Sequence, residues 1–398
     1  MAVVHPFRAL RPVQENAREI ACVPYDVINT QEARALAKGN AKSFLHVIRP
    51  EIDLPQGIDE HADIVYQTGA DNLRKYAASK ASLQEEEPSL YVYRLIMNGR
   101  AQTGIFGCVS VDDYDNDVIL KHELTRPVKE DDRTRHILEQ RAHAEPVMLT
   151  FKDDAAIASV IATTQEQDSL YDLTAADGVQ HTIWKVDDAL SLASLFQQVN
   201  HLYVADGHHR CKAASRAAAE LAEDGEVRFF PAVLFPMADM EILAYNRIIR
   251  KLPVTPKAFL QSLGGRFDLT PTENPVPSTK GDICLYIDGS WFTMTLPEPT
   301  SSNSVEDLDV GRLSDAILRP MLSIEDPRTD PNIDFVGGIR GTKELERVVD
   351  EGHAQLAISM YPTSIEELVA VSDAGLLMPP KSTWFEPKLR SGLLVHLF

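Results

Sequence analysis

The residue types best suited to chemistry gather in one short segment, residues 203–210. An apolar run over residues 202–205 leads into Asp206 and Gly207, and two histidines and an arginine follow before an alanine-rich stretch. This order predicts a strand over 202–205, a tight turn, and a helix over 212–223. Because a helix N-terminus presents unpaired backbone N–H groups and a partial positive charge, we interpret the segment as a phosphate-handling turn.

Each residue of this turn has a chemical role in that interpretation. Asp206 would hold Mg²⁺, Gly207 would permit a backbone conformation closed to other residues, and His208, His209 and Arg210 would contact phosphate. The alternative is structural, since Asp-Gly is a common turn and histidines can cap and hydrogen-bond. A zinc site would need further histidines, and the spacing of His122 and His143 does not favour one.

Two further segments carry candidate residues. Glu123 follows a histidine just before a strongly charged stretch, so its carboxylate could act as a general base, although a solvated loop with a capping carboxylate explains this pattern better when it is taken alone. Near the C-terminus, Lys381, Ser382 and Thr383 follow two prolines and are suited to bind phosphate or carboxylate. This segment lacks the glycines of a P-loop, and a surface turn is its alternative interpretation.

Composition limits the function classes. The chain has 398 residues, 44% hydrophobic and 25% charged, which is ordinary for a globular protein with room for two or three cores. The net charge of −20 disfavours binding to nucleic acid and to anionic membranes. No apolar run is long enough to span a bilayer, and the N-terminal residues lack the pattern of a signal peptide. The four cysteines are far apart in the sequence, which favours the reducing cytoplasm.

The sequence patterns predict a mixture of helices and strands around these residues. In the first half the patterns predict a strand at 43–48, a helix at 58–78, a hairpin of 89–95 with 102–109 turning at Asn98-Gly99, a helix at 130–143 and a strand at 145–151. In the second half they predict strands at 229–235, 283–287, 291–295 and 355–360, and helices at 344–352 and 365–373. Thr363 is the expected N-cap of the last helix.

These motifs together resemble a family of domains of unknown function whose relatives include free-serine kinases of the SerK and SbnI type. The resemblance runs along most of the chain, through Pro-Tyr-Asp-Val-Ile at 24–28, His-Glu-x-Thr at 122–125, Ala-Asp-Gly-His-His-Arg at 205–210, and Pro-Lys-Ser-Thr at 380–383. It implies an α/β (α+β) fold with a ParB/sulfiredoxin-like mixed-sheet core carrying N-terminal and C-terminal elaborations. We expect an N-terminal α/β region at 1–110, a nucleotide-binding core at 111–252, and a C-terminal α/β region at 253–398 that completes the cleft.

The resemblance also implies a reaction, which is phosphoryl transfer from ATP or ADP to a small hydroxyl acceptor with Mg²⁺ as cofactor. Free L-serine, giving O-phosphoserine, is the acceptor expected. Glu123, with Glu130 as a second candidate, would be the base, and Asp206 and His209 would join it in catalysis. Gly207, His208 and Arg210 would bind nucleotide phosphates, Asp206 would hold the metal, and residues 381–383 would bind substrate.

Two alternatives stay open at this point. A ParB-like nucleotide-binding regulatory protein would use the same turn without catalysis. A sulfiredoxin-like redox enzyme needs a cysteine in the phosphate turn, whereas Cys211 comes just after Arg210 and is better explained as a small packing residue. The sequence leaves open whether the chain forms a homodimer, and it predicts nucleotide and small-molecule ligands without membrane association.

Overall fold

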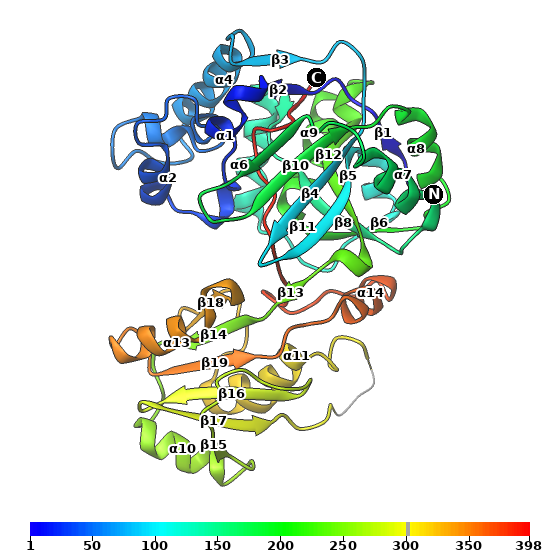
Figure 1. Cartoon of the computed structure of the whole chain (residues 1–398). Coiled ribbons are helices and arrows are strands. Elements are labelled where there is room, and N and C mark those ends of the chain that lie inside the picture. The colour runs from blue at the N-terminus through cyan, green and yellow to red at the C-terminus, as the bar shows by residue number, and fades with distance from the viewer. Residues whose placement is uncertain (300–302) are drawn as a thin grey trace. The chain divides into compact units, whose positions relative to one another are not determined.

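The computed structural model describes residues 1–299 and 303–398, which form two compact units (Figure 1). The first unit comprises Met1–Lys121, Thr125–Met240 and Pro387–Phe398. The second comprises His122–Leu124 and Glu241–Glu386. The chain therefore leaves the first unit twice, and its last twelve residues complete the unit in which the chain began.

A nine-stranded mixed sheet forms the centre of the first unit. Its order is β6-β11-β8-β12-β5-β4-β10-β9, and β1 pairs with β5. These strands are β1 (Val4–His5), β4 (Tyr91–Met97), β5 (Arg100–Ser110), β6 (Ile119–Leu120), β8 (Val147–Phe151), β9 (Tyr171–Thr174), β10 (Gln180–Lys185), β11 (Leu202–Asp206) and β12 (Phe229–Pro236). The pairs β8–β12 and β6–β11 are parallel, and the other pairs are antiparallel. The predicted mixed α/β class with a mixed-sheet core is confirmed.

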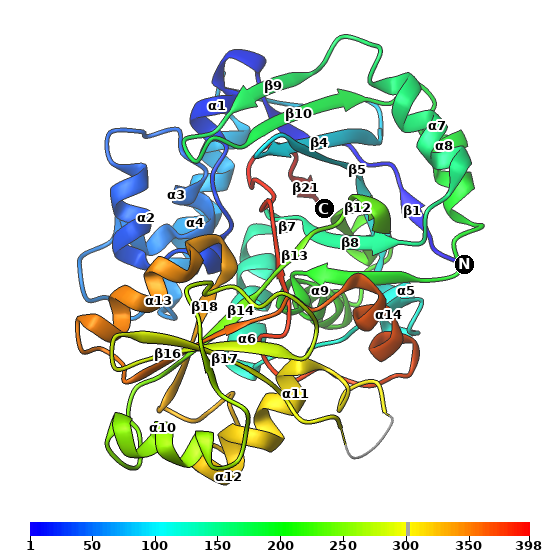
Figure 2. The ribbon, with the colours of Figure 1, turned by 60° about the horizontal axis from the view of Figure 1, so that its bottom comes forward.

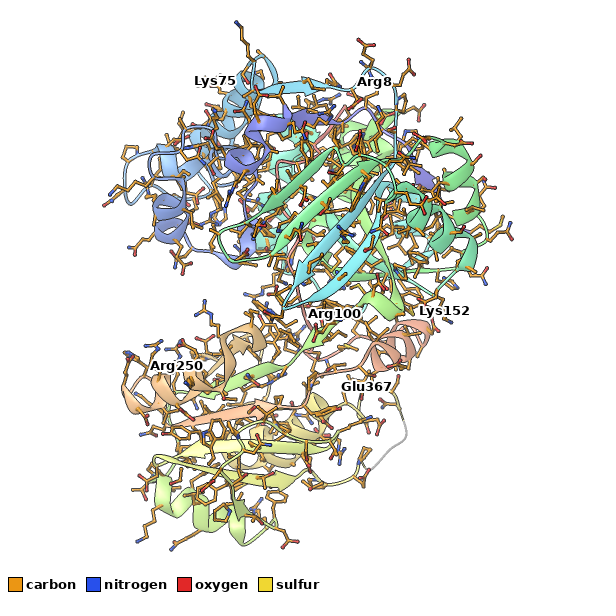
Figure 3. All side chains as sticks on the ribbon, in the orientation of Figure 1. Arg8, Lys75, Arg100, Lys152, Arg250 and Glu367 are labelled. Carbon is orange, nitrogen blue, oxygen red and sulfur yellow. The ribbon has the colours of Figure 1, made fainter. Side chains whose placement is uncertain are left out.

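The helices that pack around this sheet are α1 (Ala17–Ile20), α2 (Thr30–Ala37), α3 (Leu45–Ile48), α4 (Asp63–Ala77), α5 (Val111–Asp115), α6 (Pro127–Gln140), α7 (Ala155–Thr164), α8 (Ala189–Phe196) and α9 (His208–Leu221). Helices α5, α7, α8 and α9 share the hydrophobic core of the sheet, whereas α1–α4 contribute to a separate hydrophobic cluster. Helices α7 and α8 lie side by side, with α8 against β1 (Figure 2). Helix α9 packs against α6 and α5 and contacts β8 and β12. Charged side chains cover the outer surface, as Lys75 on α4 illustrates (Figure 3).

Short strands tie the two ends of the chain into the first unit. They are β2 (Leu10–Pro12), which pairs with β3 (Ser82–Gln84), and β21 (His396–Leu397), which pairs with β7 (Ala142–His143). Backbone bridges also join Leu10 to Val395 and Cys22 to Ser391. The C-terminal tail is thus fixed along the first unit by backbone hydrogen bonds.

A six-stranded antiparallel sheet forms the second unit, in the order β15-β17-β16-β19-β14-β18. Its strands are β14 (Tyr245–Ile249), β15 (Thr270–Pro271), β16 (Asp282–Ile287), β17 (Ser290–Thr295), β18 (Ile333–Gly337) and β19 (Leu356–Met360). A separate pair joins β13 (Ile242–Leu243) to β20 (Trp384–Phe385). The helices are α10 (Pro256–Gly264), α11 (Asp309–Leu313), α12 (Arg319–Leu322), α13 (Gly341–Asp350) and α14 (Ile365–Asp373).

Most of the expected elements are confirmed, and two local predictions are wrong. Asn98 and Gly99 both have positive φ, 53° and 80°, as the predicted tight hairpin turn requires. Residues 43–48 were expected to form a strand, but residues 45–48 form helix α3, because a short apolar run has no periodicity that separates a strand from a buried helix. Helix α14 is capped by Ser364 in a capping box with Glu367, whereas the hydroxyl of Thr363 donates to the backbone of Ser382.

The expected division at residue 110 falls inside the large sheet, because β5 ends there and pairs with β12. Strands from the expected N-terminal region and from the expected core therefore belong to one sheet. The other expected division, at residue 252, lies close to the point where the second unit begins at Glu241. The three regions stay a prediction about how the chain is organised.

Candidate functional site

The predicted phosphate turn is a strand–turn–helix junction in the first unit. Strand β11 ends at Asp206, and Gly207, with φ 101° and ψ 28°, is the N-cap of α9. Helix α9 begins at His208, four residues before the predicted start, because the left-handed glycine turns the chain directly into the helix. Gly207 has no side chain with which to cap the helix, and the N-terminus of a helix carries a partial positive charge that attracts anions.

A β-bulge in β11 aims Asp206 out of the sheet. Val204 pairs with Leu149 and Asp206 pairs with Met148, so the register shifts across Ala205. Such an extra residue bends a strand and redirects the side chain that follows it, and bulges are frequent beside functional sites. The buried apolar residues of β11 therefore hold the strand in the sheet while its last residue presents a carboxylate at the turn.

Two cations surround the Asp206 carboxylate. Lys388 donates from Nζ to Oδ2 at 2.8 Å, and Arg210 Nη2 lies 3.8 Å from Oδ1. Burial by itself raises the pKa of a carboxyl, but the charges of Lys388 and Arg210 outweigh it and hold the pKa of Asp206 well below its usual range. Asp206 is therefore ionised at every physiological pH.

Arg210 is buried beneath the turn and held from several sides. Its Nη1 donates to the carbonyl of Pro146, and its Nη2 lies 3.8 Å from Oδ2 of Asp26. A Cβ on Gly207 would come within 3.1 Å of Arg210 Nε and of Val147 Cγ1. Gly207 is thus required both for the backbone conformation and for the space that Arg210 occupies.

The two histidines of the turn have different surroundings. His208 is buried, and burial lowers its pKa to about 3, so its imidazole is neutral at physiological pH. His209 accepts a hydrogen bond at Nε2 from the backbone N–H of Arg126, with the two nitrogens 3.0 Å apart. This nitrogen therefore carries no proton, and the side chain links the turn to the residue that precedes α6.

A buried ion pair lies behind Arg210. Glu145 accepts from the backbone N–H of Tyr25 at 3.0 Å and from the hydroxyl of Ser391 at 3.3 Å, and its Oε2 lies 3.5 Å from Nη1 of Arg133. The guanidinium of Arg133 lies over the ring of Tyr25, 3.9 Å from its centroid. The stiff segment around Tyr25 is thus a structural support of the site, and Asp26 extends from it toward Arg210.

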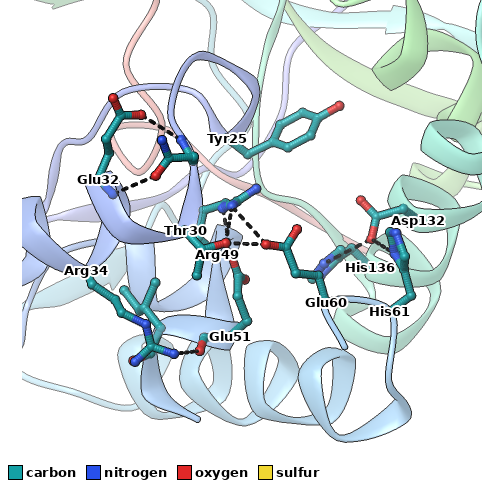
Figure 4. A network of polar contacts seen from close by, with 12 residues as sticks. Tyr25, Thr30, Glu32, Arg34, Arg49, Glu51, Glu60, His61, Asp132 and His136 are labelled. Atoms are coloured by element: carbon teal, nitrogen blue, oxygen red, sulfur yellow. Dashed lines mark hydrogen bonds and ion pairs between the residues drawn. The ribbon is translucent and has the colours of Figure 1, made fainter. Parts of the chain in front are cut away.

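This support continues into a polar network among α2, the segment before α4, and α6 (Figure 4). Asp132 accepts at Oδ1 from Tyr66 at 3.1 Å, lies 3.3 Å from His61, and pairs through Oδ2 with Arg133 at 2.6 Å. Burial works against this charge, but Arg133 outweighs it and lowers the pKa of Asp132 to about 2. Nearby, Arg49 and Glu51 form a second ion pair, with Nε of the arginine 2.8 Å from Oε1 of the glutamate. The network fixes the first turns of α6 relative to the N-terminal helices.

The remaining predicted site residues belong to the second unit, except Glu130. Here Nε2 of His122, beside Glu123, lies 3.3 Å from Oγ1 of Thr383, and its carbonyl accepts from the backbone of Met378. Ser382 is buried and donates to the carbonyl of Pro379 at 2.6 Å, which is a turn-stabilising role. The structure thus brings residues 122–123 and 381–383 together.

Lys381 and Glu130 are both held by neighbours. Lys381 has φ 59°, its carbonyl accepts from Arg247, and its Nζ lies 5.4 Å from the ring centroid of Tyr245. Glu130 lies in the first unit, where it accepts from Thr125 and pairs with Arg216 at 3.2 Å. A single cleft that gathers Glu123, the Asp206 turn and residues 381–383 stays a prediction.

Sequence reasoning missed Lys388 and Glu145. Lys388 is 182 residues from Asp206 in the sequence, and no local pattern marks it. Glu145 stands next to Pro146 at the start of a strand, which gives no sign of a buried charge. Only the return of the C-terminal tail along the first unit brings Lys388 to the turn.

Across residues 1–299 and 303–398, no cluster of three or more His, Cys, Asp or Glu side chains could hold a metal ion without other ligands. In the same residues, no helix has the length and apolar character needed to cross a membrane. All four cysteines are unpaired and buried. Burial raises the pKa of the Cys211 thiol to about 12, so this cysteine is a packing residue under the turn.

Residues 4–311 match the family model described as "Protein of unknown function (DUF1015)". The chain belongs to this family. A comparison with curated proteins finds no significant match.

Solved structures similar to this chain include a free serine kinase in complex with AMP, at 10% identity and a TM-score of 0.36, covering 72% of this chain and 92% of that one. Another is SbnI with a C-terminal truncation from Staphylococcus aureus, at 14% identity and a TM-score of 0.39, covering 73% and 87%. A third is a conserved hypothetical protein from Pyrococcus furiosus, at 12% identity and a TM-score of 0.37, covering 72% and 95%.

Proposed function

We propose that this protein is a phosphotransferase that moves a phosphoryl group from ATP or ADP to a small hydroxyl acceptor, with free L-serine as the acceptor and O-phosphoserine as the product. The observation that carries the proposal is the junction at Asp206–His208, where a left-handed glycine begins helix α9 beside an ionised carboxylate and two cations. The motif resemblance to free-serine kinases supports the choice of reaction and acceptor.

The junction suits the binding of nucleotide phosphates. The first N–H groups of α9 would donate to phosphate oxygens, and Gly207 leaves the backbone open to close approach. Arg210 is buried and engaged with Pro146, Asp26 and Asp206, so we assign it to fixing the turn and to raising the local positive potential. Its permanent charge stabilises the negative charge on the transferred group.

The proposed transfer needs positioning and charge stabilisation more than covalent help. A bond forms between the acceptor oxygen and the terminal phosphorus, the bond from that phosphorus to the nucleotide oxygen breaks, and the nucleotide leaves with one phosphate fewer. The hydroxyl proton passes to a carboxylate base, for which Glu123 is our candidate. His209, with Nε2 accepting from Arg126, would position the turn and thereby serve catalysis indirectly.

Asp206 is the carboxylate that would hold Mg²⁺, which would neutralise charge on the phosphates. The residues fit a site of the common magnesium type, in which one or two carboxylates act together with substrate phosphates. The Asp206 carboxylate would share its charge between the metal and its ion pairs with Lys388 and Arg210. Residues 381–383 would hold the acceptor, with Lys381 as the cation for its carboxylate. We place the reaction in the cytoplasm, where four unpaired cysteines are stable.

The test is ³¹P NMR of the protein with Mg²⁺, ATP or ADP, and a pool of free amino acids that includes L-serine. A new phosphomonoester signal is expected with wild type, and its loss is expected in both Glu123→Gln and Asp206→Ala. Glu273→Gln, at an exposed glutamate of the second unit, is the matched control and should keep full turnover. Nucleotide binding without any phosphomonoester would reject the phosphotransferase and favour the nucleotide-binding regulatory protein.

A further inference from the structure

The C-terminal tail contributes the ammonium of Lys388 to the charged groups of the turn. Its side chain is 15% exposed and that of Asp206 is 28% exposed, so the pair is only partly open to water. The pair is therefore screened less than an ordinary surface salt bridge. Its Nζ lies 2.8 Å from Oδ2 of a residue that directly precedes the N-cap of α9.

The backbone around Lys388 is held in place by its neighbours in the tail. Two residues later, Arg390 donates from its backbone N–H to the hydroxyl of Tyr93 and from Nε to Nε2 of His181, at 3.3 and 3.2 Å. Ser391 pairs through its backbone with Cys22. The ammonium of Lys388 is thus presented at the turn by a fixed backbone, as a binding group requires.

We propose that Lys388 is a phosphate-binding residue, and that Asp206 positions its ammonium for the nucleotide phosphate bound at the N-terminus of α9. This inference rests on the proposed function, because it assigns a further residue to that nucleotide site. An ammonium has three donors on a flexible stem, so Lys388 can hold Asp206 and turn a donor to a phosphate oxygen at the adjacent helix end.

The competing explanation is that Lys388 only neutralises Asp206. Removing Lys388 alone does not separate the two, because it would leave the Asp206 carboxylate with only Arg210 as a cationic partner, and the less compensated carboxylate would repel phosphate in either case. The background in which Asp206 is already neutral does separate them. In that background, a lysine that only neutralises Asp206 would make no contribution to binding, whereas a lysine that binds phosphate would still contribute.

The experiment measures ADP binding by isothermal titration calorimetry in EDTA, with wild type, Lys388→Met, Asp206→Asn and the double variant. Lys388→Met is expected to weaken binding about 10- to 100-fold, the size of a charge-assisted hydrogen bond. The double variant is expected to bind ADP at least about tenfold more weakly than Asp206→Asn. Lys185→Met is the matched control, since it breaks an ion pair of 2.7 Å with Glu85 in the same unit and should not change the affinity.

Equal affinity in Asp206→Asn and the double variant, with unchanged thermal unfolding midpoints, would overturn the role of Lys388. If Lys388 matters for ADP binding while no phosphomonoester appears by ³¹P NMR, only the phosphotransferase is rejected. If wild type binds neither ADP nor pyrophosphate at millimolar concentrations, the nucleotide site and the role of Lys388 are rejected together.

Discussion

Substitution of Gly207 by alanine should impair both stability and nucleotide binding. Gly207 has φ 101°, and left-handed backbone costs an L-residue about 1–2 kcal/mol. The new Cβ would also lie 3.1 Å from Arg210 Nε and Val147 Cγ1, and such crowding in a packed site costs about 1–3 kcal/mol. We therefore expect Gly207→Ala to lower the free energy of unfolding by about 2–5 kcal/mol.

A second glycine of the first unit separates the two contributions. Gly178 has φ 84°, and a Cβ there meets no atom within 4 Å among the described residues. Gly178→Ala should therefore cost only the backbone term of about 1–2 kcal/mol and leave nucleotide binding unchanged. Gly207→Ala should in addition displace Arg210 and weaken ADP binding.

The assay is differential scanning calorimetry together with calorimetric titration of ADP. About 1 kcal/mol corresponds to a shift of roughly 2–4 °C in the unfolding midpoint for a unit of this size, so the two variants should be resolved from each other. If Gly207→Ala melts no lower than Gly178→Ala and binds ADP like wild type, the argument that this glycine shapes the site is refuted.

Three further predictions concern buried groups around the turn. The unfolded state binds a proton at His208 near pH 6.5 and the folded state only near pH 3, so lowering the pH between these values should reduce the free energy of unfolding by up to about 1.4 kcal/mol per pH unit. Urea unfolding at pH 6.5, 5.5 and 4.5 should show a smaller loss of stability on acidification in His208→Gln than in wild type. Parallel curves for the two proteins would contradict this. Cys211, with its pKa raised by burial to about 12, should resist iodoacetamide at pH 8, and Cys211→Ala should keep ADP binding; an adduct found by peptide mass mapping would revive the sulfiredoxin-like alternative. Glu145→Ala should leave Arg133 with only part of its compensating negative charge and lower the free energy of unfolding by about 3–5 kcal/mol. Since about 1 kcal/mol shifts the melting midpoint by roughly 2–4 °C, a midpoint within about 2 °C of wild type would show that the pair is dispensable.

Local sequence predicts the strand–turn–helix junction around Gly207 well because its determinants are adjacent residues. The apolar residues of β11, the glycine at 207 and the alanines of α9 each favour the element that they form, and the three elements follow one another without a gap. Only the start of the helix was displaced, since the sequence does not show that Gly207 itself serves as the N-cap. The hairpin at Asn98-Gly99 was predictable for the same reason.

The electrostatic surroundings of the turn could not be predicted, because they depend on contacts between distant segments. Lys388 reaches Asp206 only through the return of the chain to the first unit, and Glu145 acquires its partners from Tyr25, Arg133 and Ser391. No pattern of spacing encodes such contacts. Ser382 illustrates the converse, because a hydroxyl that looks chemically available is buried and bonded within its own turn.

The central claim is that nucleotide phosphates bind at the N-terminus of α9. A crystal structure of the protein with ADP tests it most directly. The account predicts the terminal phosphate within hydrogen-bond distance of the backbone N–H groups at His208 and His209 and of Lys388 Nζ. An ordered ADP bound elsewhere, or an empty turn in crystals grown at saturating ADP, would contradict it.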